Sequence, residues 1–137
     1  MRNKLLVIFV SGALAAPSVA LAHHSFAMFD KTRTIELHGV VKEFQWVNPH
    51  TWIELAVRDS HGKVVEWAIE GRSPNVLSRR GWRKDLIHPG DMLTVKAYPL
   101  RDGTPGGAAV RVTLASGQQI NADTPTAVDT DEEGPRQ

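Results

Sequence analysis

Histidines are the side chains with which this chain has the clearest means of doing chemistry. Two of the six histidines, His23 and His24, are adjacent, and His50 lies between two tryptophans, Trp46 and Trp52. Imidazole nitrogens bind copper and other transition metals, and a thiolate site is excluded because the chain has no cysteine. The histidines therefore predict nitrogen-based metal binding, provided that the fold brings further donors to them.

Residues 1–22 have the three-part layout of a secretory signal peptide. Residues 1–4 are short and basic, residues 5–10 are apolar, and Ala20-Leu21-Ala22 presents small residues where signal peptidase reads them. The apolar run is too short to span a bilayer, although a retained membrane anchor is the alternative interpretation. We expect export to the periplasm, cleavage after residue 22, and no membrane span after processing.

Cleavage there would leave His23 as the first residue, with a free α-amine beside its imidazole. These two nitrogens can chelate one metal ion, because an α-amine titrates near pH ~8 and a metal displaces its proton under mild conditions. Copper suits such nitrogen donors, and the thioether of Met28 is a soft further ligand. The alternative is that His23 and His24 are solvated terminal residues without a role.

A predicted β-hairpin brings His50 close to Glu70. In the predicted strands 51–58 and 63–70, the odd-numbered residues form an apolar face: Ile53, Leu55, Val57, Val65, Trp67 and Ile69. Because side chains alternate along a strand, His50 and Glu70 share the outer face, opposite or diagonal to one another. This pair could complete a metal site begun by His23 or His24. The alternative is a hydrogen bond that only stabilises the sheet.

The remaining pattern predicts a small barrel. Ser73-Pro74 indicates the start of a short helix that stops at Gly81. A change of apolar parity at Gly39 predicts a β-bulge in the first strand. Besides the hairpin, period-two alternation predicts strands over residues 34–46, 92–98 and 108–114. We therefore expect an all-β domain with one short helix over residues 23–121. Its element order is that of an OB-fold-like five-stranded Greek-key barrel, with a generic sandwich or open roll as the alternative.

The C-terminal residues 122–137 and the overall charge narrow the range of partners. The tail is rich in Asp, Glu, Thr and Pro and is predicted to be disordered. The formal net charge is +1, and loss of Arg2 and Lys4 with the leader leaves 14 basic and 15 acidic residues, a net of −1. So weak a balance argues against general nucleic-acid binding, which needs a basic stripe.

Motifs of known enzymes are absent from the sequence. It contains no Gly-x-Ser-x-Gly, no Gly-rich phosphate loop and no His-Glu-x-x-His. We therefore predict a non-catalytic role, with a small copper-dependent oxidoreductase as a further alternative.

Several short motifs together resemble a known group of sequences. They are HHSFAMFD, FQWVNPHTW, VEWAIEG, RRGW and HPGD. The chain resembles a family of small exported bacterial proteins of unknown function, whose mature chains begin His-His-Ser-Phe and carry a Trp-x-Asn-Pro-His element. The resemblance extends from residue 23 to about residue 119. It implies an envelope or periplasmic setting and a compact β-domain, and it supplies no catalytic residues.

The sequence thus predicts a periplasmic β-barrel that binds copper without catalysis. The predicted ligands are His23, His24 and His50, with Glu70 or Met28 in support. The alternative is a metal-free interaction module, in which the face around Trp52 and the N-terminal arm bind an envelope protein or small ligand.

Overall fold

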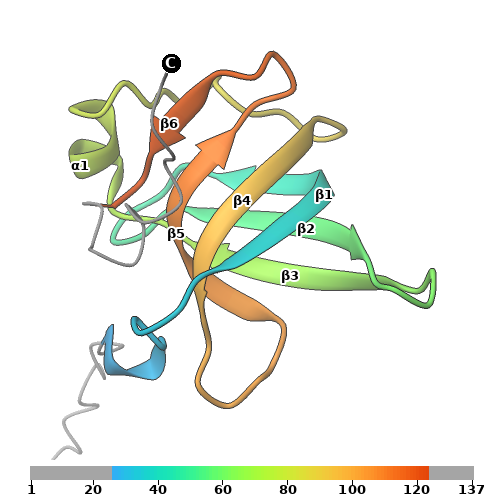
Figure 1. The fold of residues 1–137 in the computed structure, drawn as a ribbon. Coiled ribbons are helices and arrows are strands. Elements are labelled where there is room, and N and C mark those ends of the chain that lie inside the picture. The colour runs from blue at the N-terminus through green and yellow to red at the C-terminus, as the bar shows by residue number, and fades with distance from the viewer. Residues whose placement is uncertain (1–25, 124–137) are drawn as a thin grey trace, which may run out of the picture.

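The structure is a computed structural model that describes residues 26–123. Its elements are η1 (Phe26–Met28), β1 (Ile35–Gln45), β2 (Trp52–Arg58), β3 (Val64–Glu70), α1 (Pro74–Ser78), β4 (Met92–Pro99), β5 (Gly106–Thr113) and β6 (Gln119–Asn121). Figure 1 shows the strands wrapped around one interior, with α1 and η1 on the left and the tip of the β2–β3 hairpin reaching to the right. Among the described residues, no helix has the length and apolar character needed to cross a membrane.

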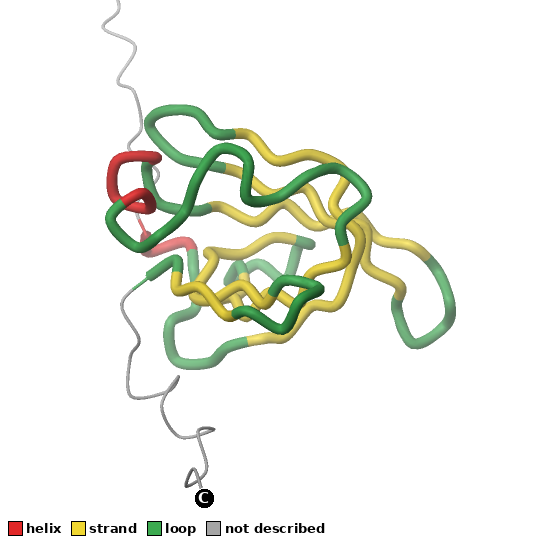
Figure 2. Tube along the Cα trace, turned by 90° about the horizontal axis from the view of Figure 1, so that it is seen from above, coloured by secondary structure: helices red, strands yellow, loops and turns green. Residues whose placement is uncertain are grey.

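Five strands close into a barrel. The sheet order is β3-β2-β1-β4-β5-β6, and a parallel pairing between β3 and β5 joins the two ends of the five-stranded part. β6 adds to the outer side of β5, and α1 lies between β3 and β4 in the chain. Seen from above, the strands form a ring whose connecting loops run over it (Figure 2). The predicted all-β, OB-fold-like barrel with one short helix is confirmed.

The predicted bulge in β1 is present, but its predicted position is wrong. The register with β2 shifts between Val41 and Glu43, not at Gly39. The apolar residue that follows Gly39, Val40, is 37% exposed, while Val41 is buried. Gly39 instead faces the interior, where a Cβ would stand only 2.6 Å from the carbonyl oxygen of Ala56. Glycine is therefore required for the close approach of two strands and not for the bulge.

The barrel interior is filled by alternating residues from all five strands. Leu55, Ile69, Val95 and Val112 are each fully buried, and α1 adds Leu77 to the same core. Burial of each large aliphatic side chain stabilises the fold by roughly 1.5–3 kcal/mol. Because the chain has no disulfide to assist it, this core holds the barrel closed.

The short helix begins where the sequence predicts and ends earlier. Ser73 is the N-cap, its side chain accepts a hydrogen bond from the amide of Val76, and Pro74 occupies the first position. The helix ends at Ser78, and a further turn carries the chain to Gly81, which has a φ of 89°. Only this following turn, and not the helix itself, uses the left-handed conformation that favours glycine.

The folded body extends two residues beyond the predicted boundary at residue 121. Ala122 and Asp123 are buried, and both backbone amides donate to the carbonyl of Val110. The Asp123 carboxylate also accepts two hydrogen bonds from Nη2 of Arg72, at 2.8 and 3.0 Å. Ala122 and Asp123, which the prediction assigned to the tail, thus pack on the barrel. Residues 124–137, like the predicted signal peptide 1–22, lie outside the described residues.

Candidate functional site

His50 and Glu70 meet at the open end of the β2–β3 hairpin. Trp52 pairs with Glu70 in the register, so His50, two residues before Trp52, is diagonal to Glu70. The imidazole Nδ1 of His50 contacts Oε1 of Glu70. The predicted contact between these two side chains is therefore present.

The burial of this pair differs from the expectation. Glu70 was predicted to face outward, yet its side chain is only 5% exposed, whereas that of His50 is 30% exposed. β5 runs alongside this part of β3, pairing Glu70 with Ala108, and the N-terminal segment gathers over the same region. A buried carboxylate needs a partner, and His50 supplies one.

Backbone bonds beyond the two strands hold His50 in place. The amide and the hydroxyl of Thr51 both donate to the carbonyl of Arg72, at 3.2 and 3.0 Å. The Gly71 amide in turn donates to the carbonyl of Thr51 at 2.8 Å. A Cβ on Gly71 would collide with the Thr51 hydroxyl, so a glycine is needed where the two chains approach. The hairpin ladder therefore continues past Glu70 and fixes the residue next to His50.

A small cavity of about 80 Å³ lies beside the buried carboxylate. Its lining combines one acidic and several apolar residues: Met28, Phe29, Trp52, Ala68, Glu70, Leu100, Pro105, Gly106 and Gly107. Two of the five predicted ligands, Met28 and Glu70, thus share one cavity, and a further one, His50, contacts Glu70. Such a space is large enough for an ion or two to three small molecules of the size of water.

The N-terminal segment reaches this cavity because the loop after β4 binds its backbone. The Asp30 amide donates to the carbonyl of Pro99 at 2.8 Å, and the Arg101 amide donates to the carbonyl of Met28 at 3.0 Å. Phe29 forms an isolated antiparallel bridge with Leu100, and its side chain is buried. Met28 is thereby held at the cavity edge, with 38% of its surface exposed.

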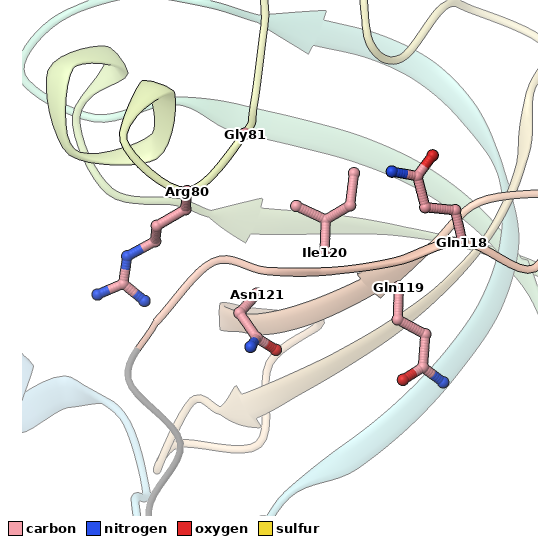
Figure 3. Close-up of a pocket in the computed structure, with 6 residues that line it drawn as sticks. All are labelled: Arg80, Gly81, Gln118, Gln119, Ile120 and Asn121. Atoms are coloured by element: carbon pink, nitrogen blue, oxygen red, sulfur yellow. The ribbon is translucent and has the colours of Figure 1, made fainter.

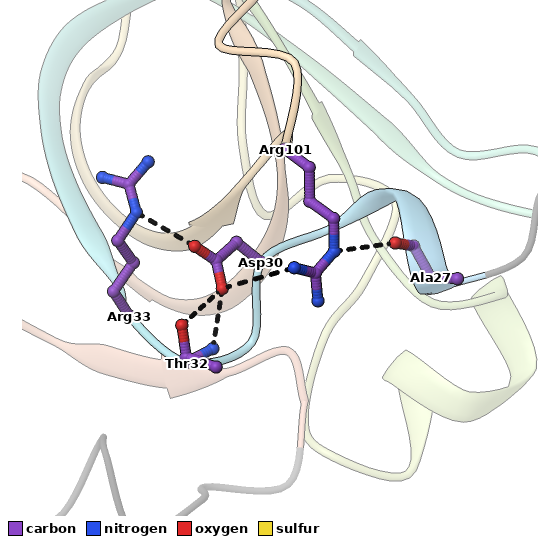
Figure 4. Close-up of polar contacts among 5 residues, drawn as sticks. All are labelled: Ala27, Asp30, Thr32, Arg33 and Arg101. Carbon is purple, nitrogen blue, oxygen red and sulfur yellow. Dashed lines mark hydrogen bonds and ion pairs between the residues drawn. The ribbon is translucent and has the colours of Figure 1, made fainter.

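Charged side chains strengthen the same attachment (Figure 4). Arg101 lies between the Asp30 carboxylate and the Ala27 carbonyl, to which its Nε donates at 3.0 Å. Hydrogen bonds from the hydroxyl and the amide of Thr32 lower the pKa of Asp30 below its ordinary value of 3.8. A hydrogen bond from Arg33 and the positive charge of Arg101 lower this pKa further. We name residues 27–33 with Arg101 the N-terminal clamp. His23 and His24 lie outside the described residues, three and two positions before its neighbour Phe26.

Two other described histidines contact partners elsewhere in the barrel. His38 contacts Thr94 through Nδ1 at 2.9 Å and Glu36 through Nε2 at 3.1 Å, and His88 lies 3.7 Å from Asp91. Within residues 26–123, no three side chains of His, Cys, Asp or Glu gather in a way that could hold a metal ion.

A second, larger cavity of about 400 Å³ was not predicted. It lies between the turn after α1 and the strand β6, and its lining is Arg80, Gly81, Gln118, Gln119, Ile120 and Asn121. Figure 3 shows Ile120 pointing from β6 towards Gly81, while Gln119 and Asn121 point to the other side of the strand. No local sequence pattern connects the basic residues near α1 to residues almost forty positions later.

The fold and the site together define a small closed β-barrel protein in which a partly exposed histidine contacts a buried carboxylate at one hairpin end. The chain belongs to a family of unknown function, DUF6152, whose model matches residues 11–109. Membership of an uncharacterised family was the expectation from the motifs. No curated protein matches the sequence, and no solved structure matches it either.

Proposed function

We propose that this protein is exported to the periplasm and binds one copper ion without catalysis at its processed N-terminus. In this proposal residues 1–22 are removed, His23 and His24 supply the first ligands, and His50 completes the site. The single observation that supports it most is the contact of His50 with the buried Glu70, beside a cavity whose edge carries Met28.

The chemistry of Glu70 supports a role as the hydrogen-bond partner of a metal-binding histidine rather than as a metal ligand. A metal-binding histidine usually donates its second ring N–H to a carboxylate, which fixes the tautomer and orients the ring. Glu70 contacts Nδ1 of His50, so Nε2 is the nitrogen through which this imidazole would bind copper. Met28 could add a thioether, which Cu(I) favours over Cu(II).

The N-terminal clamp keeps the start of the described chain close to the cavity, which supports His23 and His24 as the remaining ligands. It fixes the chain at Ala27 and Met28, within five residues of His23. An extended chain covers at most about 3.3–3.6 Å per residue, so His23 and His24 can reach the cavity edge from there.

Titration with Cu(II) tests the proposal. The protein beginning at His23 is compared with a version that carries one extra residue before it, which removes the α-amine from the chelate. We expect tight binding by the first and a loss of at least tenfold in the second. His50→Ala should also weaken binding, Glu70→Gln should weaken it by roughly 10–100-fold, and the exposed turn variant His61→Ala serves as the matched control. Absence of Cu(II) binding by the correctly processed protein would overturn the proposal.

A metal-free interaction module is the second candidate, and the composition of the small cavity favours it. Phe29, Trp52 and Leu100 give the cavity an apolar wall that a copper ion does not require. A small envelope ligand with an apolar part would stabilise the protein on binding. A low-molecular-weight envelope extract should then raise the Tm of the wild type and leave that of Trp52→Ala unchanged, with Gln119→Ala as the control. An equal rise in both would count against this cavity as the site.

A further inference from the structure

The larger cavity beside Arg80 has a lining suited to a ligand other than a metal ion. Its lining is polar, with one guanidinium and the amide side chains of Gln118, Gln119 and Asn121. Guanidinium and amide N–H groups are the donors that proteins use to bind carboxylates. The chemical class of ligand that this cavity fits is therefore a carboxylate.

The charge around the cavity agrees with that ligand. Four basic residues follow one another on and after the end of α1, and we name them the basic rim: Arg79, Arg80, Arg83 and Lys84. Arg83 is partly balanced by Asp85 at 3.1 Å, and Arg79, Arg83 and Lys84 are exposed. The side chain of Trp82 in the middle of the rim is buried and donates to the carbonyl of Asn121 at 2.9 Å. The rim is thus tied directly to the strand that forms the other wall.

The chain itself supplies carboxylates at the same place. β6 ends at Asn121, so residues 124–137 start next to the cavity that Asn121 lines. They contain four acidic residues and one basic residue, a net of −3. The acidic residues are Asp129, Asp131, Glu132 and Glu133. Asp129 is six positions after Asp123, so an extended chain between them spans up to about 20 Å.

Asp123, the acidic residue directly before this C-terminal stretch, already makes such a contact. Asp123 receives two hydrogen bonds from Arg72, the residue that precedes the N-cap of α1. The contact of the acidic stretch with basic residues around α1 therefore begins within the described residues. Its continuation onto the basic rim needs no change in the barrel.

We propose that the cavity and the basic rim form a carboxylate-binding surface, whose ligand is the acidic tail of the same chain, residues 124–137. Individual surface ion pairs are weak and screened by salt. A short tether raises the effective concentration of the tail to the order of millimolar, so that pairing too weak to matter between separate molecules suffices within one chain.

NMR spectra of the ¹⁵N-labelled full chain test this surface. A neutral-tail variant combines Asp129→Asn, Asp131→Asn, Glu132→Gln and Glu133→Gln. At low salt we expect the amide signals of Gly81, Gln119 and Asn121 to differ in position between wild type and variant. At about 1 M salt, where the Debye length is about 3 Å, the difference should vanish. Identical spectra at low salt, or a difference that persists at high salt, would overturn the proposal.

Single substitutions on the barrel distinguish binding of the tail at the basic rim from a general effect of net charge. Arg80→Gln, introduced into both wild type and neutral-tail variant, should abolish most of the difference between them. Lys63→Gln, in the exposed β2–β3 turn, removes the same charge elsewhere and should preserve the difference. Equal behaviour of the two substitutions would show that the tail responds to net charge and not to this surface. Copper binding plays no part in these spectra, so their outcome is independent of the proposed function.

Discussion

The two cavities described above, one beside Glu70 and one beside Arg80, differ in the charged groups that line them. The smaller one buries the Glu70 carboxylate and gives it one imidazole partner. The larger one presents Arg80 and three amide side chains around a wider space. A buried charge without its partner is costly, whereas exposed polar groups exchange their partners with water at little cost. The first arrangement therefore suits a fixed ligand such as a metal ion, and the second suits a weak and replaceable one.

The largest expected effect on stability comes from removing the partner of Glu70 in the smaller cavity. His50→Ala leaves the Glu70 carboxylate buried without its imidazole, and we expect a loss of about 3 kcal/mol in the free energy of unfolding. For a body of this size the Tm should fall by more than about 10 °C. Urea unfolding followed by tryptophan fluorescence measures the loss.

Substitution of the other member of the pair, Glu70, provides the comparison. Glu70→Gln leaves the partly exposed His50 with access to water, so it should cost clearly less than His50→Ala. The double variant His50→Ala with Glu70→Leu removes the buried charge together with its partner and should recover part of the stability. If the two single variants lose the same stability, then the pair does not carry a buried charge that depends on His50.

An intermediate loss of stability is expected when the contact between Arg72 and Asp123 is removed. Asp123→Ala removes the bidentate partner of Arg72 and should cost about 2 kcal/mol. Differential scanning calorimetry measures the change, and Asp85→Ala, on an exposed ion pair, is the control with little expected loss. An Asp123 variant as stable as this control would place the end of the folded body before residue 122.

A small effect is expected at the larger cavity. Gln118→Ala and Gln119→Ala remove exposed amides, and each should change the free energy of unfolding by no more than about 0.5 kcal/mol. Chemical denaturation at low and high salt provides the measurement. A loss comparable to that of His50→Ala would remove the contrast between the two cavities.

The smallest effect is a shift in titration at the N-terminal clamp. Asp30 has its pKa lowered below 3.8, first by the hydrogen bond from the Thr32 side chain. Its contribution to stability is therefore present above about pH 3.8 and is lost as the pH falls through the folded-state pKa. Thr32→Ala should raise the pKa of Asp30 towards its ordinary value, so that this loss begins at a higher pH. A carboxyl-detected NMR titration measures the pKa, and Thr104→Ala, which acts on Asp102, is the control.

The β-hairpin and the barrel could be predicted because they follow from local periodicity. Alternation in residues 51–70 determines which residues face inward, and the contact of His50 with Glu70 follows from that register. The bulge was misplaced because Val40 is apolar yet exposed. Period-two reasoning cannot distinguish an exposed valine from a buried one, and the interior position of Gly39 depends on its partner strand.

The surroundings of the two cavities could not be predicted for a different reason. Glu70 shares its cavity with Met28 and Leu100, which come from distant parts of the chain. Arg80 and Asn121 come together through the bond of Trp82 to β6, across 39 residues. No spacing in the sequence records such contacts. Alternation predicted the pair itself, and only the assembled barrel reveals its burial.

The clamp between Arg101 and the Ala27 carbonyl implies an order of assembly. This bond closes a loop of 74 residues, whereas His50 and Glu70 belong to one hairpin. Shorter loops close at a lower entropic cost, so the hairpin can form first and the N-terminal segment docks only once β4 and its following loop are in place. Pulsed hydrogen exchange during refolding should accordingly show protection of the Asp30 amide after that of the β2–β3 amides. The segment that is synthesised first would then be the last to find its place, and any ligand held by it would bind only a finished barrel.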